Sequence, residues 1–313
     1  MRQYFFFIAL VVALVLGFSN ALDLDEVAQN GLVRGTIVAA ILFLTAVTID
    51  FRDFGKLLQR PLAVLLAFVL SFVCVPLLAV LIGGMLDADS RLGLLVMAAA
   101  PATMSSATVW TGRANGNQAM SLAISMLTNS SCFLLTPLCL AWLADLPEGA
   151  TIEVPSLMRN LLVLVIIPIV IAQVVRRHQK VPALCKQWRA LIGNAVQLGV
   201  LIMALFGATV TGLRMQANAN SMTLVSVASV VLGVILLRLI GLGCGVACTR
   251  LIKLEPTDRT AVTIAGTQKT LVVGLEVGTD LGCSILPIIG YHIAQLTIDT
   301  LFAGWVRKRA KRE

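Results

Sequence analysis

A polar cluster lies inside an apolar segment that runs over residues 257–278. Gly266-Thr267-Gln268-Lys269-Thr270 places a lysine, a glutamine and two threonines there. Lys269 lies ten positions beyond Arg259, about 15 Å at helical rise and so about half-way across a bilayer. A charge at that depth costs about 2.5–3.5 kcal/mol on insertion scales, which favours a functional role over a lysine buried only for packing. Gly266 and Gly274 flank the cluster and favour a helix that opens.

A second polar cluster interrupts an earlier apolar segment, residues 92–110. Pro101 is followed there by Thr103, Ser105 and Ser106. Proline removes one helical hydrogen bond, so the freed carbonyl needs an ion, water or ligand as its partner. Ordinary kinking explains one such helix, but a matched pair of interrupted helices is the pattern that indicates a transporter's binding site.

The elements that must position these clusters are membrane helices. Hydrophobic residues make up 58% of the 313 residues and charged residues 13%, whereas soluble domains average about 25% charged. Ten apolar segments have bilayer-spanning length. They are predicted near Gln3–Ala21, Leu32–Ile49, Pro61–Gly83, Leu92–Trp110, Gln118–Ala144, Asn160–Val175, Leu191–Leu213, Met222–Val246, Thr257–Gly278 and Ile285–Val306.

Loop charges orient these segments. Basic residues gather on one side, at Arg2, Arg52, Lys56, Arg60, Arg113, Arg176, Arg177, Lys180, Lys186, Arg189, Arg250, Lys253, Arg259, Arg307, Lys308, Arg309, Lys311 and Arg312. Acidic residues gather on the other, at Asp23, Asp25, Glu26, Asp87, Asp89, Asp145, Glu148, Glu153 and Asp280. The positive-inside rule then places both termini in the cytoplasm and the chain in the inner or plasma membrane. The net charge of +8 is thus explained by topology and indicates no nucleic-acid partner.

The predicted fold class is an all-α membrane protein with ten transmembrane helices in one polytopic domain, residues 1–313. Five segments fall in each half, about 1–145 and 156–313, and an odd number per half gives the inverted repeats known from many transporters. A cleavable signal peptide over Met1–Ala21 is the alternative interpretation of the first segment.

The remaining polar residues support smaller predictions. Arg238 and Asp299, in the eighth and tenth segments, are expected to form a buried ion pair. His292 is interpreted as a packed residue; Asn194, Gln197 and Gln295 are candidates to face a cleft. Gly241, Gly243 and Gly245 are interpreted as helix-packing residues. No zinc spacing, nucleophile motif or paired carboxylates occur, and the seven cysteines resemble small apolar side chains, so enzymatic activity is not expected.

Over nearly its whole length the sequence resembles the bile acid:sodium symporter family, in its distant bile-acid-transporter-like branch. The matching motifs are Ala100-Pro101 with Ser105-Ser106, Arg113-Ala-Asn115-Gly116-Asn117, and Gly266-Thr267-Gln268-Lys269. The resemblance implies a core domain and a flatter panel domain, with unwound fourth and ninth helices that cross near the midplane. It also implies transport of an organic anion, often coupled to sodium.

The family's sodium ligands are only partly present. The resemblance implies site roles for Ser106, Thr128, Asn129 and Gln268, but the family's acidic residue on the ninth helix is Ile264 here. A family asparagine is Lys269, another is Ala107, and a third-helix glutamine aligns with Ser71. An ammonium beside the site repels sodium by several kcal/mol at intermediate dielectric, so sodium dependence is not expected.

Lys269 therefore has two interpretations. Its ammonium takes the place of sodium and ties the crossed helices together, or it faces the cleft and pairs with an anionic substrate, with a proton-carrying role as a variant. The candidate substrate- or ion-site residues are Thr103, Ser105, Ser106, Thr128, Asn129, Thr267, Gln268, Lys269 and Thr270. The predicted function is secondary transport of a small organic anion by alternating access, without a cofactor and with sodium or proton coupling left open. A non-transporting membrane regulator or receptor of the same fold is the alternative.

Overall fold

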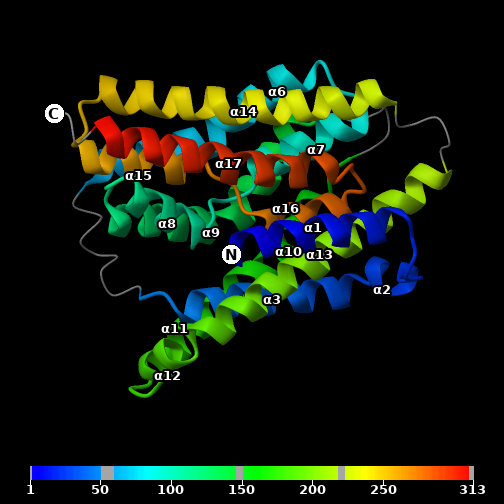
Figure 1. Ribbon diagram of the computed structural model, residues 1–313, viewed down its shortest axis with the longest axis horizontal. Helices are drawn as coiled ribbons and strands as arrows, with labels where there is room; N and C mark the ends of the chain where they lie inside the picture. The colour runs from blue at the N-terminus through cyan, green and yellow to red at the C-terminus, as the bar shows by residue number, and fades with distance from the viewer. Residues whose placement is uncertain (1, 51–59, 146–150, 218–222, 310–313) are drawn as a thin grey trace.

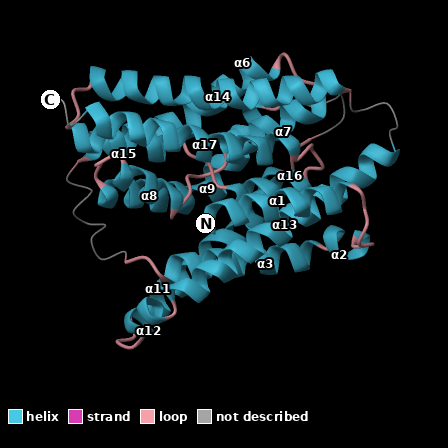
Figure 2. Cartoon of the chain, viewed as in Figure 1, coloured by secondary structure: helices cyan, strands magenta, loops and turns pink. Residues whose placement is uncertain are grey.

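The computed structural model describes residues 2–50, 60–145, 151–217 and 223–309, and these form helices, turns and loops without a strand (Figure 1, Figure 2). Several residues used to orient the chain lie outside the described parts: Arg52, Lys56, Glu148, Lys311 and Arg312. The prediction of an all-helical protein is confirmed for the residues described.

The helices fall where the apolar segments predict them. Their bounds are α1 (Arg2–Phe18), α2 (Asp25–Gln29), α3 (Gly31–Val47), α5 (Pro61–Val69), η1 (Leu70–Cys74), α6 (Val75–Gly83), α7 (Ala88–Ala99), α8 (Ser106–Arg113), α9 (Gln118–Leu143), α10 (Val154–Leu161), η2 (Leu162–Ile166), α11 (Ile167–Arg176), α12 (Val181–Gln187), α13 (Arg189–Ala217), α14 (Leu224–Leu251), α15 (Pro256–Thr267), α16 (Leu271–Asp280) and α17 (Leu286–Arg309). The short helices α2 and α12 were not predicted.

Five described helical segments are long and apolar enough to cross a membrane: Pro61–Gly83, Gln118–Leu143, Val154–Arg176, Arg189–Arg214 and Leu224–Leu251. Shorter apolar helices cover Ile8–Phe18 and Gly31–Val47. The chain is therefore a multi-pass membrane protein.

The helices pack as two groups, which we call the α3 group and the α17 group. In the α3 group, α13 contacts α1 and α3, and α3 contacts α11. In the α17 group, α17 contacts α7 and α14, while α15 contacts α5, α9 and α14. The α3 group occupies the lower part of Figure 1 and the α17 group the upper part. Helix α16 lies between them and contacts α3 and α13 as well as α7 and α17.

A π-helical turn, η1, interrupts the third apolar segment for a reason that the sequence supplies. Pro76 follows the turn and has no N–H to donate. The Val75 N–H bonds the Leu70 carbonyl, five residues back, and is thus unavailable to the Ser71 carbonyl. In a π-helix the Ser71 carbonyl would accept from the nitrogen of residue 76, but that residue is Pro76, which has no N–H. The Ser71 carbonyl is therefore left without a backbone donor in the middle of an apolar helix.

The two ends of the molecule differ. We call the end with α12, the start of α15 and the end of α17 the basic end, at the left of Figure 1, and the end with α2 and the α16–α17 turn the acidic end. At the acidic end, buried Arg34 of α3 contacts Glu276 (3.4 Å) and Asp280 of α16 and donates to the Ala28 carbonyl (3.0 Å). At the basic end, Asp258 accepts from Asn117 (2.7 Å) and pairs with Arg60.

Candidate functional site

The α7–α8 and α15–α16 interruptions meet inside the molecule. Helix α7 ends at Ala99 and α8 begins at Ser106, while α15 ends at Thr267 and α16 begins at Leu271. The Thr270 N–H donates to the Pro101 carbonyl at 2.8 Å. The Thr103 hydroxyl donates to Gln268 Oε1 at 2.6 Å, and Ser106 Oγ lies 3.1 Å from the same oxygen. Two segments more than 160 residues apart in sequence are thus joined by backbone and side-chain bonds.

Lys269 joins the same junction to the π-helical turn. Its side chain is fully buried, and Nζ donates to the Ser71 carbonyl (2.6 Å), to Ser71 Oγ (2.9 Å) and to the Ala100 carbonyl (3.0 Å). Nζ also lies 5.6 Å from the centre of the Phe72 ring. The ammonium thus meets the carbonyl that Pro76 leaves unpaired, and Lys269 has no ion pair with a carboxylate of the described residues.

A second buried cation lies on the other side of the junction. Arg238 of α14 and Asp299 of α17 form the predicted ion pair, with both side chains fully buried. Arg238 Nη1 donates to the Thr267 carbonyl at 2.7 Å, and the Tyr291 hydroxyl donates to the same oxygen at 2.9 Å. Gln268 Nε2 donates to Asp299. The prediction of a buried Arg238–Asp299 pair is confirmed.

Helices α9 and α17 hold the interrupted backbone in place. Thr128 Oγ1 accepts from the Ala102 N–H (3.2 Å), and Asn129 Nδ2 donates to the Ala102 carbonyl (2.7 Å). On α17, Gln295 accepts from the Lys269 N–H (3.0 Å) and donates to the Lys269 carbonyl (2.9 Å). Side-chain amides and a hydroxyl replace the helical partners that these backbone groups lack.

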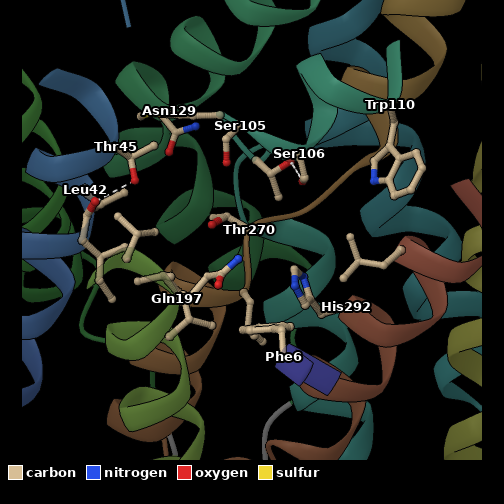
Figure 3. Close-up of a pocket in the computed structure, with 18 of the residues that line it drawn as sticks. Phe6, Leu42, Thr45, Ser105, Ser106, Trp110, Asn129, Gln197, Thr270 and His292 are labelled. Atoms are coloured by element: carbon tan, nitrogen blue, oxygen red, sulfur yellow. Dashed lines mark hydrogen bonds between the residues drawn. The ribbon is translucent and has the colours of Figure 1, made fainter. Parts of the chain in front are cut away.

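A cavity of about 560 Å³ adjoins the junction. Figure 3 shows Thr270 between Ser105 and Ser106 on one side and Gln197 and His292 on the other. The cavity is open to the outside of the molecule, as the exposed side chains of Ser105 and Gln197 in its lining indicate. Its wall is otherwise mainly apolar and includes Phe6, Ile41, Leu42, Met104, Trp110, Val200, Leu271 and Leu296. The lining residues, all in described parts of the chain, include no Asp, Glu, Lys or Arg.

Helix N-termini give this cavity a positive electrostatic potential, although no charged side chain of the described residues lines it. The first turns of α8 and α16 supply Ser106, Leu271 and Val272 to its wall. First-turn N–H groups have no intrahelical acceptors and carry partial positive charge. Thr270 precedes α16 without capping it through its side chain. The opposite helix ends, with negative partial charge, receive Lys269 at α7 and Arg238 at α15. The arrangement therefore favours an anion in the cavity.

The candidate residues divide into two sets. Thr103, Ser105, Ser106, Asn129 and Thr270 line the cavity. Thr128, Thr267, Gln268, Lys269 and Gln295 are buried behind it and hold the junction together. Gln197 lines the cavity, whereas Asn194 is exposed on α13 outside the lining.

Most of the other lining residues were not identified from the sequence as cavity residues. Phe6, Thr45 and Trp110 lie in apolar segments where nothing in the local pattern separates them from lipid-facing neighbours. His292, interpreted as a packed residue, lines the cavity and accepts at Nδ1 from Gln295 (3.0 Å). The spacing of three residues between His292 and Gln295 could have indicated this position, because residues three apart share a helix face and Gln295 was expected to face a cleft.

Comparison with known proteins decides the family. The model of the SBF-like CPA transporter family matches residues 3–308. The chain belongs to this family. The resemblance to bile acid:sodium symporters is thereby confirmed, and the role of the chain is non-enzymatic.

Curated relatives are similar over much of the chain. A probable chloroplastic sodium/metabolite cotransporter, BASS4, of Arabidopsis thaliana is 26% identical over 69% of this chain and 52% of its own length. An uncharacterized sodium-dependent transporter, YocS, of Bacillus subtilis is 26% identical over 72% of this chain and 66% of its own. The chain thus spans between about half and two thirds of the length of these relatives.

Proposed function

We propose that this protein is a secondary transporter of a small organic anion, such as a carboxylate, a sulfate or a bile-acid-like molecule. The observation that carries the proposal is the cavity beside the junction, with the uncapped first turn of α16 in its wall. Backbone N–H groups and hydroxyls there bind one anionic group. The apolar remainder of the wall fits the body of an amphipathic molecule, as ligand cavities usually do.

The two helix groups supply the moving parts of an alternating-access cycle. The cavity is lined by the α3 group, through Thr45 and Gln197, and by the α17 group, through Ser105 and His292. At the acidic end the buried contact of Arg34 with Glu276 joins the α3 group to α16, the helix between the two groups. We infer that in this conformation the cavity opens toward the basic end, since Trp110 and Thr300 in its wall lie beside Arg113, Arg307 and Lys308. The transport cycle requires the Arg34 contacts to break as the opposite end closes.

The proposed membrane arrangement has ten crossings in two inverted five-helix repeats. The α7–α8 and α15–α16 pairs serve as interrupted fourth and ninth crossings, the α17 group as the core domain and the α3 group as the panel domain. Loop charges place both termini in the cytoplasm and the protein in the cell membrane. The positions of the interruptions, Ala100–Ser105 and Gln268–Thr270, support this arrangement.

We further propose that Lys269 takes the place of a coupling sodium ion. Its ammonium bonds three oxygens from two elements, η1 and the end of α7. It does not line the cavity, which favours the tie between helices over the pairing with substrate. A relative is named a sodium-dependent transporter, whereas this chain carries a fixed positive charge at the junction.

Flux into proteoliposomes tests the proposed function. Labelled monocarboxylates, dicarboxylates, sulfate esters and bile-acid-like anions are offered to reconstituted protein whose folding is verified by its thermal transition. Saturable uptake of at least one anion, competed by its unlabelled form and absent from empty liposomes, is expected. Absence of uptake across the panel, from folded protein, would favour the regulatory or receptor function instead.

A further inference from the structure

A second hollow lies on the outside of the α17 group, away from the junction. It has two connected parts between α14, α15 and α17. One is a cavity of about 240 Å³ whose lining includes three arginines: Arg250, Arg259 and Arg309. The other is a groove of about 690 Å³ between α14 and α17. Val246, Arg250, Phe302, Trp305 and Arg309 line both parts, so the two form one continuous site.

The positive charge of this cavity is only partly neutralised by the described residues. Arg250 and Arg259 have no ion pair with a carboxylate of the described residues. Arg259 donates through Nη2 to the Leu254 carbonyl (3.2 Å), but its Nε is buried without an acceptor in the described parts of the chain. The third arginine, Arg309, stacks over the Trp305 ring, 5.8 Å from its centre. Arg250 and Arg259 line the cavity and are exposed or partly exposed, so their guanidinium groups favour an anionic oxygen from outside the protein there.

The groove is apolar along its length. Its wall is formed by Leu239, Leu242, Gly243, Val246 and Ala247 of α14 and by Ile298, Leu301 and Phe302 of α17. From Leu239 to Arg250 the helix rises about 16 Å, about half the hydrocarbon thickness of a bilayer. Leu239, at one end of the groove, is 50% exposed, so the groove opens sideways. Its length and its lateral opening match one acyl chain of one leaflet.

The glycines of α14 explain why the groove exists. A Cβ on Gly245 would meet Thr263 at 3.0 Å, and one on Gly241 would meet Val75 at 3.7 Å. These two glycines pack against neighbouring helices, as the sequence predicts. A Cβ on Gly243 would meet nothing within 4 Å. Gly243 therefore borders the open groove, and its interpretation as a helix-packing residue was wrong.

We propose that this site binds an anionic phospholipid of the leaflet at the basic end, with its phosphate at Arg250 and Arg259 and an acyl chain along α14. Trp305 lies at the level of the headgroup, where membrane proteins place tryptophan. Basic pockets between helices on this side of a membrane protein suit acidic headgroups. A free organic phosphate would use the arginines but leave the apolar groove unoccupied.

Binding is measured on the whole purified chain, in detergent, by native mass spectrometry and by thermal shift. Phosphatidylglycerol is titrated against phosphatidylcholine, and glycerol 3-phosphate supplies the headgroup alone. One phosphatidylglycerol per chain is expected to be retained, at least tenfold more tightly than phosphatidylcholine. Glycerol 3-phosphate is expected to give no shift at the same concentrations. Equal retention of both lipids, or a shift from glycerol 3-phosphate that matches the lipid, would overturn the proposal.

Two variants test separately how much the arginine charge and the apolar groove contribute to lipid affinity. Arg250→Gln is expected to weaken phosphatidylglycerol about fivefold, the usual contribution of one basic residue near a membrane surface; Arg189→Gln, an exposed arginine on α13 outside the site, is its control. Gly243→Leu fills the groove and is expected to weaken phosphatidylglycerol at least tenfold. Its control is Gly193→Leu, at another glycine with open space around it. Unchanged affinity in both Arg250→Gln and Gly243→Leu would contradict the assignment.

Discussion

Lys269 and the Arg238–Asp299 pair are two buried charge sites with different partners. Lys269 is satisfied by neutral oxygens, of Ser71 and Ala100. Arg238 is satisfied by a carboxylate together with the Thr267 carbonyl. Each cation bonds the C-terminal end of an interrupted helix, where partial negative charge favours it. Both charges therefore stabilise the junction, whereas the cavity is lined by uncharged side chains.

Replacement of Lys269 tests its structural role. Lys269→Ala is expected to lower the free energy of unfolding by about 2–4 kcal/mol, because charged hydrogen bonds contribute about 1.5–3 kcal/mol each and the Ser71 carbonyl loses its donor. Thermal denaturation in detergent measures the loss, with exposed Lys180→Ala as the control. A fully stable Lys269→Ala protein with weakened substrate binding would instead support pairing with the anion.

Separation of Arg238 from Asp299 is expected to be costly. Arg238→Ala or Asp299→Ala strands a buried charge, at about 3–5 kcal/mol. Arg91→Ala is the matched control: its partner Asp145 is exposed, and such pairs contribute about 0–1 kcal/mol. Folded yield and melting temperature report both effects, and exchange of the two buried residues is expected to recover part of the loss. Single variants as stable as the unaltered protein would refute the energetic importance of the pair.

At the scale of the helix, the sequence predicts the positions of the apolar segments and of both polar clusters. Pro76 permits the π-helical turn η1 but does not require it, because a proline can also produce an ordinary kink. The turn and its contact with Lys269 therefore appear only in the structure. The helix opens between the two flanking glycines, where α15 ends at Thr267 and α16 begins at Leu271. Gly266 itself lies inside α15 and Gly274 inside α16, where an added Cβ would lie 3.3 Å from Ala67 and 3.1 Å from Met97, so both glycines also permit close packing.

The start of α16 provides a test at this scale. Thr270→Asp places a carboxylate at the uncapped N-terminus, where it bonds the first-turn N–H groups and contributes about 1 kcal/mol of stability. The same carboxylate is expected to exclude an anionic substrate and reduce its binding at least tenfold. Thr270→Asn caps the helix without the charge and is expected to retain more binding than the Asp variant. Equal binding in both variants would argue against an anion at this helix end.

Across the whole molecule, the family resemblance implies a core and a panel domain, but the contacts at the interface between the two helix groups could not be predicted from the sequence. Arg34 and Glu276 are 242 positions apart, and no local pattern in the sequence links them. The burial of Arg34 against α16 follows from the fold. The ten crossings, the inverted repeats and the cytoplasmic termini stay predictions, supported by loop charge and by the positions of the helices.

The Arg34 contacts are expected to hold the acidic end closed. Arg34→Gln shifts the protein toward the state that opens there, because Glu276 loses its partner. Cys283, buried at that end, reports the change through its rate of maleimide labelling after the other cysteines have been replaced. Labelling is expected to rise severalfold, whereas Arg91→Gln, at the same end but in an exposed pair, leaves the rate unchanged. An unchanged labelling rate in Arg34→Gln would show that these contacts do not hold the acidic end closed.

Anion uptake into proteoliposomes in sodium-free buffer tests whether Lys269 replaces sodium beside an anion-binding cavity. Saturable uptake is expected to be the same in sodium, potassium and choline, because Lys269 already supplies the positive charge at the junction. Uptake is expected to be lost in Thr270→Asp. A strong sodium requirement in the unaltered protein would contradict the role of Lys269, and undiminished uptake by Thr270→Asp would contradict the position of the anion.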